Sequence, residues 1–282
     1  MKIGFNLLLW TIHLEDQHLS ILEDLKRTGY DGVEVPVFMG EEAHFRAMAR
    51  RLDDLGLQRT AVSGITSTDL NPLDPDPAVR AKGVDYMKRV LDNSAAVGAT
   101  RLCGPMHSVL GHFSGAGPTE DEKKRCTEFH HVVGDHARSL NIPISLEALN
   151  RFECYFVNTM EDLNKHVERV GHPFIQGMYD TFHANIEEKE PVGSIARFAK
   201  AVEHVHISEN DRGTPGRGHV DFAGVFKGLK AIGYDGWLTI EAFGRGLKEL
   251  AAATKVWRDF FPDPKQVYEE GFVVIRDGWA KA

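Results

Sequence analysis

The chain has 282 residues, of which 42% are hydrophobic and 26% charged, so it can bury a full core and is not intrinsically disordered. Acidic residues outnumber basic ones by 41 to 33, and this net charge of −8 argues against broad binding to nucleic acid or to an anionic membrane, which need a basic face.

The cysteines and the apolar start of the chain indicate in which cellular compartment we expect the protein. Cys103, Cys126 and Cys154 form no C-x-x-C pair and no disulfide framework, which is typical of a reducing compartment. Asn6 interrupts the apolar start, and no small-x-small cleavage site follows it, so a signal peptide is not expected. No stretch reaches the roughly 18 apolar residues of a membrane helix. We expect a cytoplasmic protein that has no membrane partner.

Short apolar runs alternate with longer amphipathic segments along the whole chain. The runs predict eight strands, over residues 2–9, 32–37, 58–63, 101–104, 142–147, 175–180, 204–208 and 237–241. The amphipathic segments predict helices over residues 17–28, 41–55, 77–97, 119–139, 159–170, 194–201, 221–232 and 247–261. Residues 265–279 are expected to add a final helix.

This alternation predicts the fold. Strict βα order implies a parallel sheet, and eight units imply closure into a single (β/α)₈ TIM barrel. We therefore expect one α/β domain over residues 1–282, with the barrel over about 1–261 and a C-terminal helical extension over about 262–282. An open doubly wound sheet is the competing arrangement, but it usually carries a glycine-rich turn after the first strand. Residues 10–14, which follow that strand, contain no glycine.

Two connections from a helix to a strand share the sequence Gly-Tyr-Asp-Gly, at residues 29–32 and 233–236. A glycine just past a helix supplies the left-handed conformation that ends it, and the Asp-Gly pair turns the chain into the next strand. The recurrence favours one repeated unit over two unlike domains.

Candidate ligands stand at the ends of four consecutive predicted strands: Glu147, Asp180, His206 and Glu241. The reactive groups of a TIM barrel gather at this end of its strands. Three converging carboxylates repel one another unless a cation neutralises them. Two Glu, one Asp and one His form an oxygen-rich donor set. Such a set is typical of a Mn²⁺, Mg²⁺ or Co²⁺ site and not of a zinc site built from thiolates. Taken singly, an acid at a strand end is more often a helix cap or a surface charge, but four ligand-type residues on consecutive strands favour a metal site.

Other polar residues have simpler interpretations. His204 lies deeper in the barrel than His206, and we expect it to be packed and hydrogen-bonded. His130 and His131 are adjacent on a helix, which favours a surface role. The glycine-rich residues 213–218 follow strand seven, where barrels often bind phosphate, so a phosphosugar stays open. The alternative is a tight loop that aims Arg212 inward.

Four segments carry a resemblance to a known family. Residues 145–153, 179–185, 204–216 and 238–243 resemble the segments at the ends of strands five to eight in the ketose 3-epimerases. These are the D-tagatose, D-psicose (D-allulose) and L-ribulose 3-epimerases of the xylose-isomerase-like barrel superfamily. The resemblance spans essentially the whole barrel in order and spacing. It implies a sugar substrate, a homo-oligomer (a dimer or a tetramer) and no organic cofactor.

The resemblance also implies residue roles. Glu147, Asp180, His206 and Glu241 match the ligands of one divalent cation, for which Mn²⁺ is favoured and Co²⁺ or Mg²⁺ are alternatives. Glu147 and Glu241 match the acid/base pair as well. Glu153, His183 and Arg212 match the positions that hydrogen-bond the sugar substrate in this family.

The implied chemistry is epimerisation of a free ketose at C3. Carbon 3 of a ketose is a weak acid, so the cation polarises the C2 carbonyl and stabilises a cis-enediolate. One glutamate takes the C3 proton from one face, and the other returns a proton to the opposite face.

Other functions stay open beside this one. Hydroxypyruvate isomerase and inosose dehydratase share the barrel and the four-ligand plan. A DNA-repair endonuclease of the same superfamily needs more histidines, including one at the end of strand three, where residues 62–64 carry none. A non-catalytic sugar-binding barrel is a further class. The first strand presents Asn6 and three leucines before Trp10, where aromatic residues are usual in the family, so the preferred ketose stays open.

Overall fold

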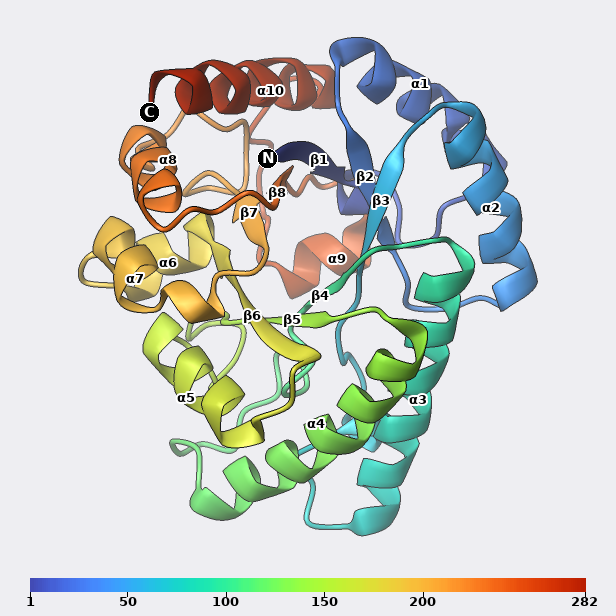
Figure 1. Ribbon diagram of the computed structural model, residues 1–282, viewed down its shortest axis with the longest axis vertical. Helices are drawn as coiled ribbons and strands as arrows, with labels where there is room; N and C mark the ends of the chain where they lie inside the picture. The colour runs from blue at the N-terminus through green and yellow to red at the C-terminus, as the bar shows by residue number, and fades with distance from the viewer.

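Eight short parallel strands close into a barrel in the computed structural model, which describes residues 1–282 (Figure 1). Each strand pairs with its neighbours in chain order, and β1 closes the barrel by pairing with β8. This confirms the predicted (β/α)₈ architecture. The strands are β1 (Lys2–Asn6), β2 (Gly32–Pro36), β3 (Gln58–Val62), β4 (Leu102–Gly104), β5 (Ile144–Glu147), β6 (Ile175–Asp180), β7 (Val205–Ile207) and β8 (Trp237–Ile240).

Helices surround the barrel and follow its strands (Figure 1). They are α1 (Leu19–Thr28), α2 (Glu42–Asp54), α3 (Pro77–Ala96), α4 (Glu120–Leu140), α5 (Met160–Val170), α6 (Thr181–Glu187), α7 (Pro191–Arg197), α8 (Phe222–Ala231), α9 (Lys248–Ala253) and α10 (Pro264–Lys281). None of them combines the length and the apolar composition that crossing a membrane requires. The helix α10 is the predicted C-terminal helical segment, and it packs against α1, α8, β1 and β8.

The helix α4 shows how local sequence sets an element. It begins in a capping box, in which the Thr119 side chain accepts a hydrogen bond from the backbone of Glu122 while the Glu122 side chain accepts one from the backbone of Thr119. It ends at Asn141, which adopts the left-handed conformation. Phe129 and Val133 are one turn apart on the face that packs against the barrel, and both are buried.

Three predicted elements differ from the structure by three residues or more at one end. The first strand ends at Asn6 instead of residue 9, because the Asn6 side chain accepts a hydrogen bond from the backbone N–H of Leu8 and caps a 3₁₀ turn over Leu7–Leu9. The helix predicted over residues 194–201 begins at Pro191, whose fixed φ suits a first helical turn. The helix predicted over residues 247–261 covers only α9, because the chain turns through a left-handed Lys255 soon after it.

The two Gly-Tyr-Asp-Gly connections adopt similar conformations in different surroundings. Gly29 has φ +116° and Gly233 has φ +72°, so both use the left-handed region that favours glycine. A Cβ on Gly29 would lie 2.8 Å from Cζ of Phe272 in α10, whereas a Cβ on Gly233 would meet nothing within 4 Å. The first connection is therefore also a packing contact with the C-terminal helix.

Replacement of these glycines tests that difference. We expect Gly233→Ala to cost about 1 kcal/mol, since the conformation is unfavourable for alanine but the space is open. Gly29→Ala should cost at least about 2 kcal/mol more, because its φ is less accessible and the new methyl group collides with Phe272. Thermal unfolding measures both, at about 2–4 °C in Tm per kcal/mol. Equal shifts in Tm would contradict this packing role.

Candidate active site

Glu34 is a buried acid inside the barrel, on β2. His204 Nε2 donates to its Oε2 at 2.8 Å, and His206 Nε2 donates to its Oε1 at 2.7 Å. Thr60 donates to Oε2 at 2.8 Å, and the Asn6 amide donates to Oε1 at 3.1 Å. The carboxylate is thus held by four donors, which is how a protein accommodates a fully buried charge. His204 is packed and hydrogen-bonded, as expected.

The network around Glu34 fixes the orientation of His206. Burial alone would raise the pKa of Glu34, but the imidazoles of His206 and His204 hold it well below its usual range. The carboxylate is therefore ionised and holds Nε2 of His206, so that Nδ1 of the same ring faces the carboxyl ends of the strands.

Three carboxylates approach that ring nitrogen. His206 Nδ1 lies 3.4 Å from Glu241 Oε1, 3.7 Å from Asp180 Oδ2 and 3.8 Å from Glu147 Oε1. The structure therefore brings together all four residues predicted as metal ligands, and all four are buried.

The same geometry fits a cation better than it fits hydrogen bonds. The three distances from the ring nitrogen exceed ordinary hydrogen-bond lengths. Nδ1 of His206 and Oε1 of Glu147 are buried, and neither has a hydrogen-bond partner. Donor atoms that share a cation bonded to each at about 2.0–2.2 Å lie about 3–3.5 Å apart. The 3.4 Å distance falls in this range and the other two exceed it by at most 0.3 Å, so a small movement would let these residues hold a divalent ion with mixed oxygen and nitrogen ligands.

The charges of these groups depend on one another. Burial, followed by the charge of Glu241, raises the pKa of Glu147 well above its ordinary value. Burial alone would raise the pKa of Asp180 too, but the Arg212 guanidinium holds it below its usual range. Burial lowers the pKa of His206, yet the carboxylates of Glu241 and Glu34 outweigh burial and raise it. Glu147 therefore holds a proton more readily than Asp180 does.

Arg212 supplies the counter-charge of the site. Its Nη1 donates to Glu241 Oε2 at 2.8 Å and to Asp180 Oδ2 at 3.1 Å, and its guanidinium lies 3.8 Å from the centre of the Phe182 ring. Its backbone is left-handed, with φ +66°, which is rare for a residue with a side chain. This strained conformation after β7 directs the guanidinium into the barrel.

The residues predicted to contact substrate share one cavity with the two glutamates. This cavity has a volume of about 410 Å³ and opens at the carboxyl ends of the strands, and Glu153, His183 and Arg212 line it together with Glu147 and Glu241. Burial, followed by the charge of Arg212, lowers the pKa of His183 to about 3, so this ring is neutral. Asp180 and His206 lie behind the lining residues.

The opposite wall of the cavity is apolar. Leu8 and Ile12 come from the segment after β1, Phe38 follows β2, and Leu250 comes from α9. Trp10 does not line the cavity, because its ring packs on Phe5 with the ring centres 5.0 Å apart. The sequence could not show that α9 contributes to this wall.

Glu209 is a buried acid that the sequence interpretation missed. Its Oε2 accepts a hydrogen bond from the Gly216 N–H at 2.9 Å, and its Oε1 accepts one from the Val220 N–H at 3.1 Å. A carboxylate of the chain therefore occupies the glycine-rich loop that was considered for phosphate. The position of Glu209, directly after a predicted apolar strand, is the sequence feature that could have indicated a buried acid.

Glu34 is the residue whose loss should damage this network most. We expect Glu34→Gln to cost about 3 kcal/mol or more, because the charge that faces His204 and His206 disappears and a carboxamide N–H then meets a ring N–H. The matched control is Thr60→Val, which removes one of the four donors but leaves the charge of Glu34 in place, and should cost about 1.5 kcal/mol. Thermal unfolding compares the two variants. A drop in Tm for Glu34→Gln no larger than that for Thr60→Val would show that the charge of Glu34 is not needed.

The comparisons with known proteins agree with the fold that carries this site. The family model of the xylose isomerase-like TIM barrel matches residues 22–277. A ketose 3-epimerase from Arthrobacter globiformis is 31% identical over 284 residues, covering 98% of this chain and 96% of the relative. The solved structure of an L-ribulose 3-epimerase matches with a TM-score of 0.91 at 28% identity, covering 99% of this chain and 95% of that one.

A second solved structure contains a sugar. It is the D-allulose 3-epimerase from Methylomonas sp. in complex with D-allulose, and it matches with a TM-score of 0.90 at 27% identity, covering 98% of this chain and 96% of that one. The family model, the full-length relative and the two solved structures therefore agree with the observed fold. The chain belongs to the ketose 3-epimerase family of the xylose isomerase-like TIM barrels and is an isomerase of the carbohydrate epimerase class.

Proposed function

We propose that this protein epimerises free ketoses at C3 in a metal-dependent reaction, with Glu147 and Glu241 as the acid/base pair. The observation that carries the proposal is the position of these two glutamates, which line one cavity and also approach the same nitrogen of His206. They stand on β5 and β8, three strands apart around the barrel. Their carboxylates therefore approach a central ligand from different sides.

Glu147, Asp180, His206 and Glu241 would hold the cation. The set of three carboxylates and one imidazole suits a hard divalent ion, and we propose Mn²⁺, with Co²⁺ or Mg²⁺ as substitutes. When bound, the ion supplies positive charge that stabilises the negative oxygens of the sugar as C3 loses its proton.

The two glutamates would move the proton. Burial and the charge of Glu241 raise the pKa of Glu147, which brings its carboxyl group closer to the range in which an acid/base group both accepts and releases a proton. One glutamate takes the C3 proton from one face of the sugar and leaves an enediolate. The other returns a proton to the opposite face, so that the configuration at C3 is inverted.

The polar side of the cavity would orient the sugar. Arg212 can donate to the sugar oxygens next to C3, and Glu153 can accept a hydrogen bond from a sugar hydroxyl. Glu153 is itself held by the Asn150 amide, which donates to its Oε1 at 2.8 Å. Leu8, Ile12 and Phe38 would meet the far end of the ketose.

Two observations favour a free ketose over the alternative substrates. Glu209 already accepts the N–H groups of Gly216 and Val220 in the loop after β7, so these donors do not serve a phosphate. Arg212 is already paired with Asp180 and Glu241, so it is not a free cationic anchor for the small acid that hydroxypyruvate isomerase binds.

Glutamine variants of the two glutamates test the acid/base pair. We expect Glu147→Gln and Glu241→Gln each to lower kcat for C3 epimerisation at least about 100-fold, because each removes one proton-transfer group. Glu249→Gln, at the rim of the same cavity, is the matched control and should keep its rate. The assay follows D-psicose, D-tagatose and L-ribulose, with hydroxypyruvate isomerisation measured alongside.

Hydrogen exchange separates an enzyme from a sugar-binding barrel. The wild-type protein should incorporate deuterium from heavy water at C3 of the ketose, and circular dichroism should show that both glutamine variants are folded. A near-normal rate in either variant would refute the two-base scheme. Tight sugar binding without exchange at C3 would refute the enzymatic proposal altogether.

Removal of the metal tests the cation. Dialysis against a chelator should abolish epimerisation, and added Mn²⁺ should restore it. Asp180→Asn should need at least about 10-fold more Mn²⁺ for half of its maximal rate, because it loses one anionic ligand. Full activity in protein that elemental analysis shows to be free of metal would contradict this dependence.

A further inference from the structure

A second cluster of ligand-type side chains lies outside the active site, between α4 and α5. Cys126 and His130 stand one turn apart on α4, and His166 approaches them from α5. Cys126 Sγ lies 3.6 Å from His130 Nδ1 and 3.7 Å from His166 Nε2, and the two ring nitrogens are 2.8 Å apart. All three side chains are buried, so the surface role expected for His130 is wrong.

The orientation of His130 is that of a metal ligand. Its Nε2 donates to the Met106 carbonyl at 3.1 Å, which leaves the lone pair on Nδ1 directed at His166 and Cys126. Histidines that bind metals are held by their other ring nitrogen in this way. Burial lowers the pKa of His130 to about 3 and lowers that of His166 as well, so both rings are neutral and able to coordinate.

The distances fit a tetrahedral zinc ion. With bond lengths of about 2.05 Å to nitrogen and 2.3 Å to sulfur, zinc ligands lie about 3.3 Å apart for two nitrogens and about 3.6 Å apart for nitrogen and sulfur. Both sulfur–nitrogen distances already match. The two nitrogens are joined by a hydrogen bond, and they need to separate by only about 0.5 Å.

We propose that Cys126, His130 and His166 form a zinc site that is separate from the active site and ties α4 to α5. One thiolate and two imidazoles suit Zn²⁺ better than the hard ions of the active site. On binding, the Cys126 thiol releases its proton to solvent. The proton that His166 shares with His130 moves to Nδ1 of His166, so that both facing nitrogens are free for the metal. This inference does not rest on the proposed function.

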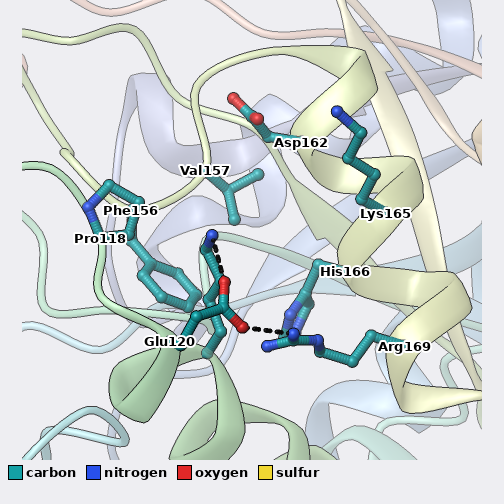
Figure 2. Close-up of a pocket in the computed structure, with 9 residues that line it drawn as sticks. Pro118, Glu120, Phe156, Val157, Asp162, Lys165, His166 and Arg169 are labelled. Carbon is teal, nitrogen blue, oxygen red and sulfur yellow. Dashed lines mark hydrogen bonds and ion pairs between the residues drawn. The ribbon is translucent and has the colours of Figure 1, made fainter.

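A surface cavity gives access to the cluster. His166 lines a cavity of about 360 Å³, and Figure 2 shows it beside Phe156 and Arg169. Glu120 stands in the same cavity, where Lys123 and Arg169 each donate to its carboxylate. An ion therefore reaches the cluster through His166 and does not have to pass through the barrel.

The cluster is connected to the active site through the loop after β4. The Cys126 thiol donates to the His107 carbonyl at 3.4 Å. The His107 ring in turn donates through Nε2 to the Glu147 carbonyl at 2.8 Å. A metal on Cys126 and His130 would therefore fix α4, α5 and this loop together, next to the strand that carries Glu147.

Cobalt titration of the full-length protein tests the proposal, because only a cysteine ligand gives a thiolate-to-Co²⁺ charge-transfer band in the near ultraviolet. We expect the band in the wild type, together with its loss on addition of Zn²⁺. Cys126→Ser should abolish the band. Cys154→Ser and Cys103→Ser are the matched controls and should keep it, because neither cysteine belongs to the cluster.

The histidine pair provides a second comparison within the same helix. His130→Asn should weaken Co²⁺ binding at this site at least about 10-fold, whereas its exposed neighbour His131→Asn should leave it unchanged. If a change on α4 prevents folding, His166→Asn on α5, at the edge of the cavity, tests the same site. Saturating Zn²⁺ should also raise the Tm of the wild type by roughly 5 °C more than that of Cys126→Ser.

Two results would overturn the site. One is the absence of a charge-transfer band in folded wild-type protein at saturating Co²⁺. The other is a band of equal size in Cys126→Ser. Neither result depends on epimerase activity, so the zinc site and the proposed function can fail independently.

Discussion

Like-charge repulsion among three buried carboxylates is the constraint on which the site depends. Glu147, Asp180 and Glu241 converge on one imidazole in a buried region, where charges interact more strongly than in bulk water. The guanidinium of Arg212 offsets part of this repulsion, because it pairs with two of these acids. A divalent cation within the same donor set would complete the neutralisation, and this explains why the acids can be kept so close together.

Orientation is maintained by a second layer of residues beneath the first. Glu34 holds His206 from below, and Asn6 links Glu34 to Glu241 by donating to both carboxylates. The strained backbone of Arg212 has a similar effect. It directs the guanidinium into the barrel from the loop that follows the three-residue strand β7. These positions leave the donor atoms of the site little freedom to relax.

The sequence predicted the repeating architecture and the strand-end acids because both are local patterns: hydrophobic periodicity, turn glycines and a polar residue where an apolar run stops. It did not predict Glu34, whose partners His204 and His206 lie 170 and 172 residues further along the chain. The error at His130 has the same origin, since its partner His166 belongs to another helix. Pairings between distant elements decide whether such a residue is buried, and periodicity carries no information about them.

The closure of the barrel has a consequence for how the protein is made. Lys2 pairs with Trp237, and the C-terminal helix α10 packs over the joint between β1 and β8, where Tyr30 donates to the Tyr268 carbonyl at 2.7 Å. One edge of β1 therefore stays unpaired until β8 has been synthesised. Because its partner strand β8 and its covering helix α10 both lie more than 200 residues further along the chain, the nascent chain has a long interval in which chaperones or neighbouring chains can bind that edge.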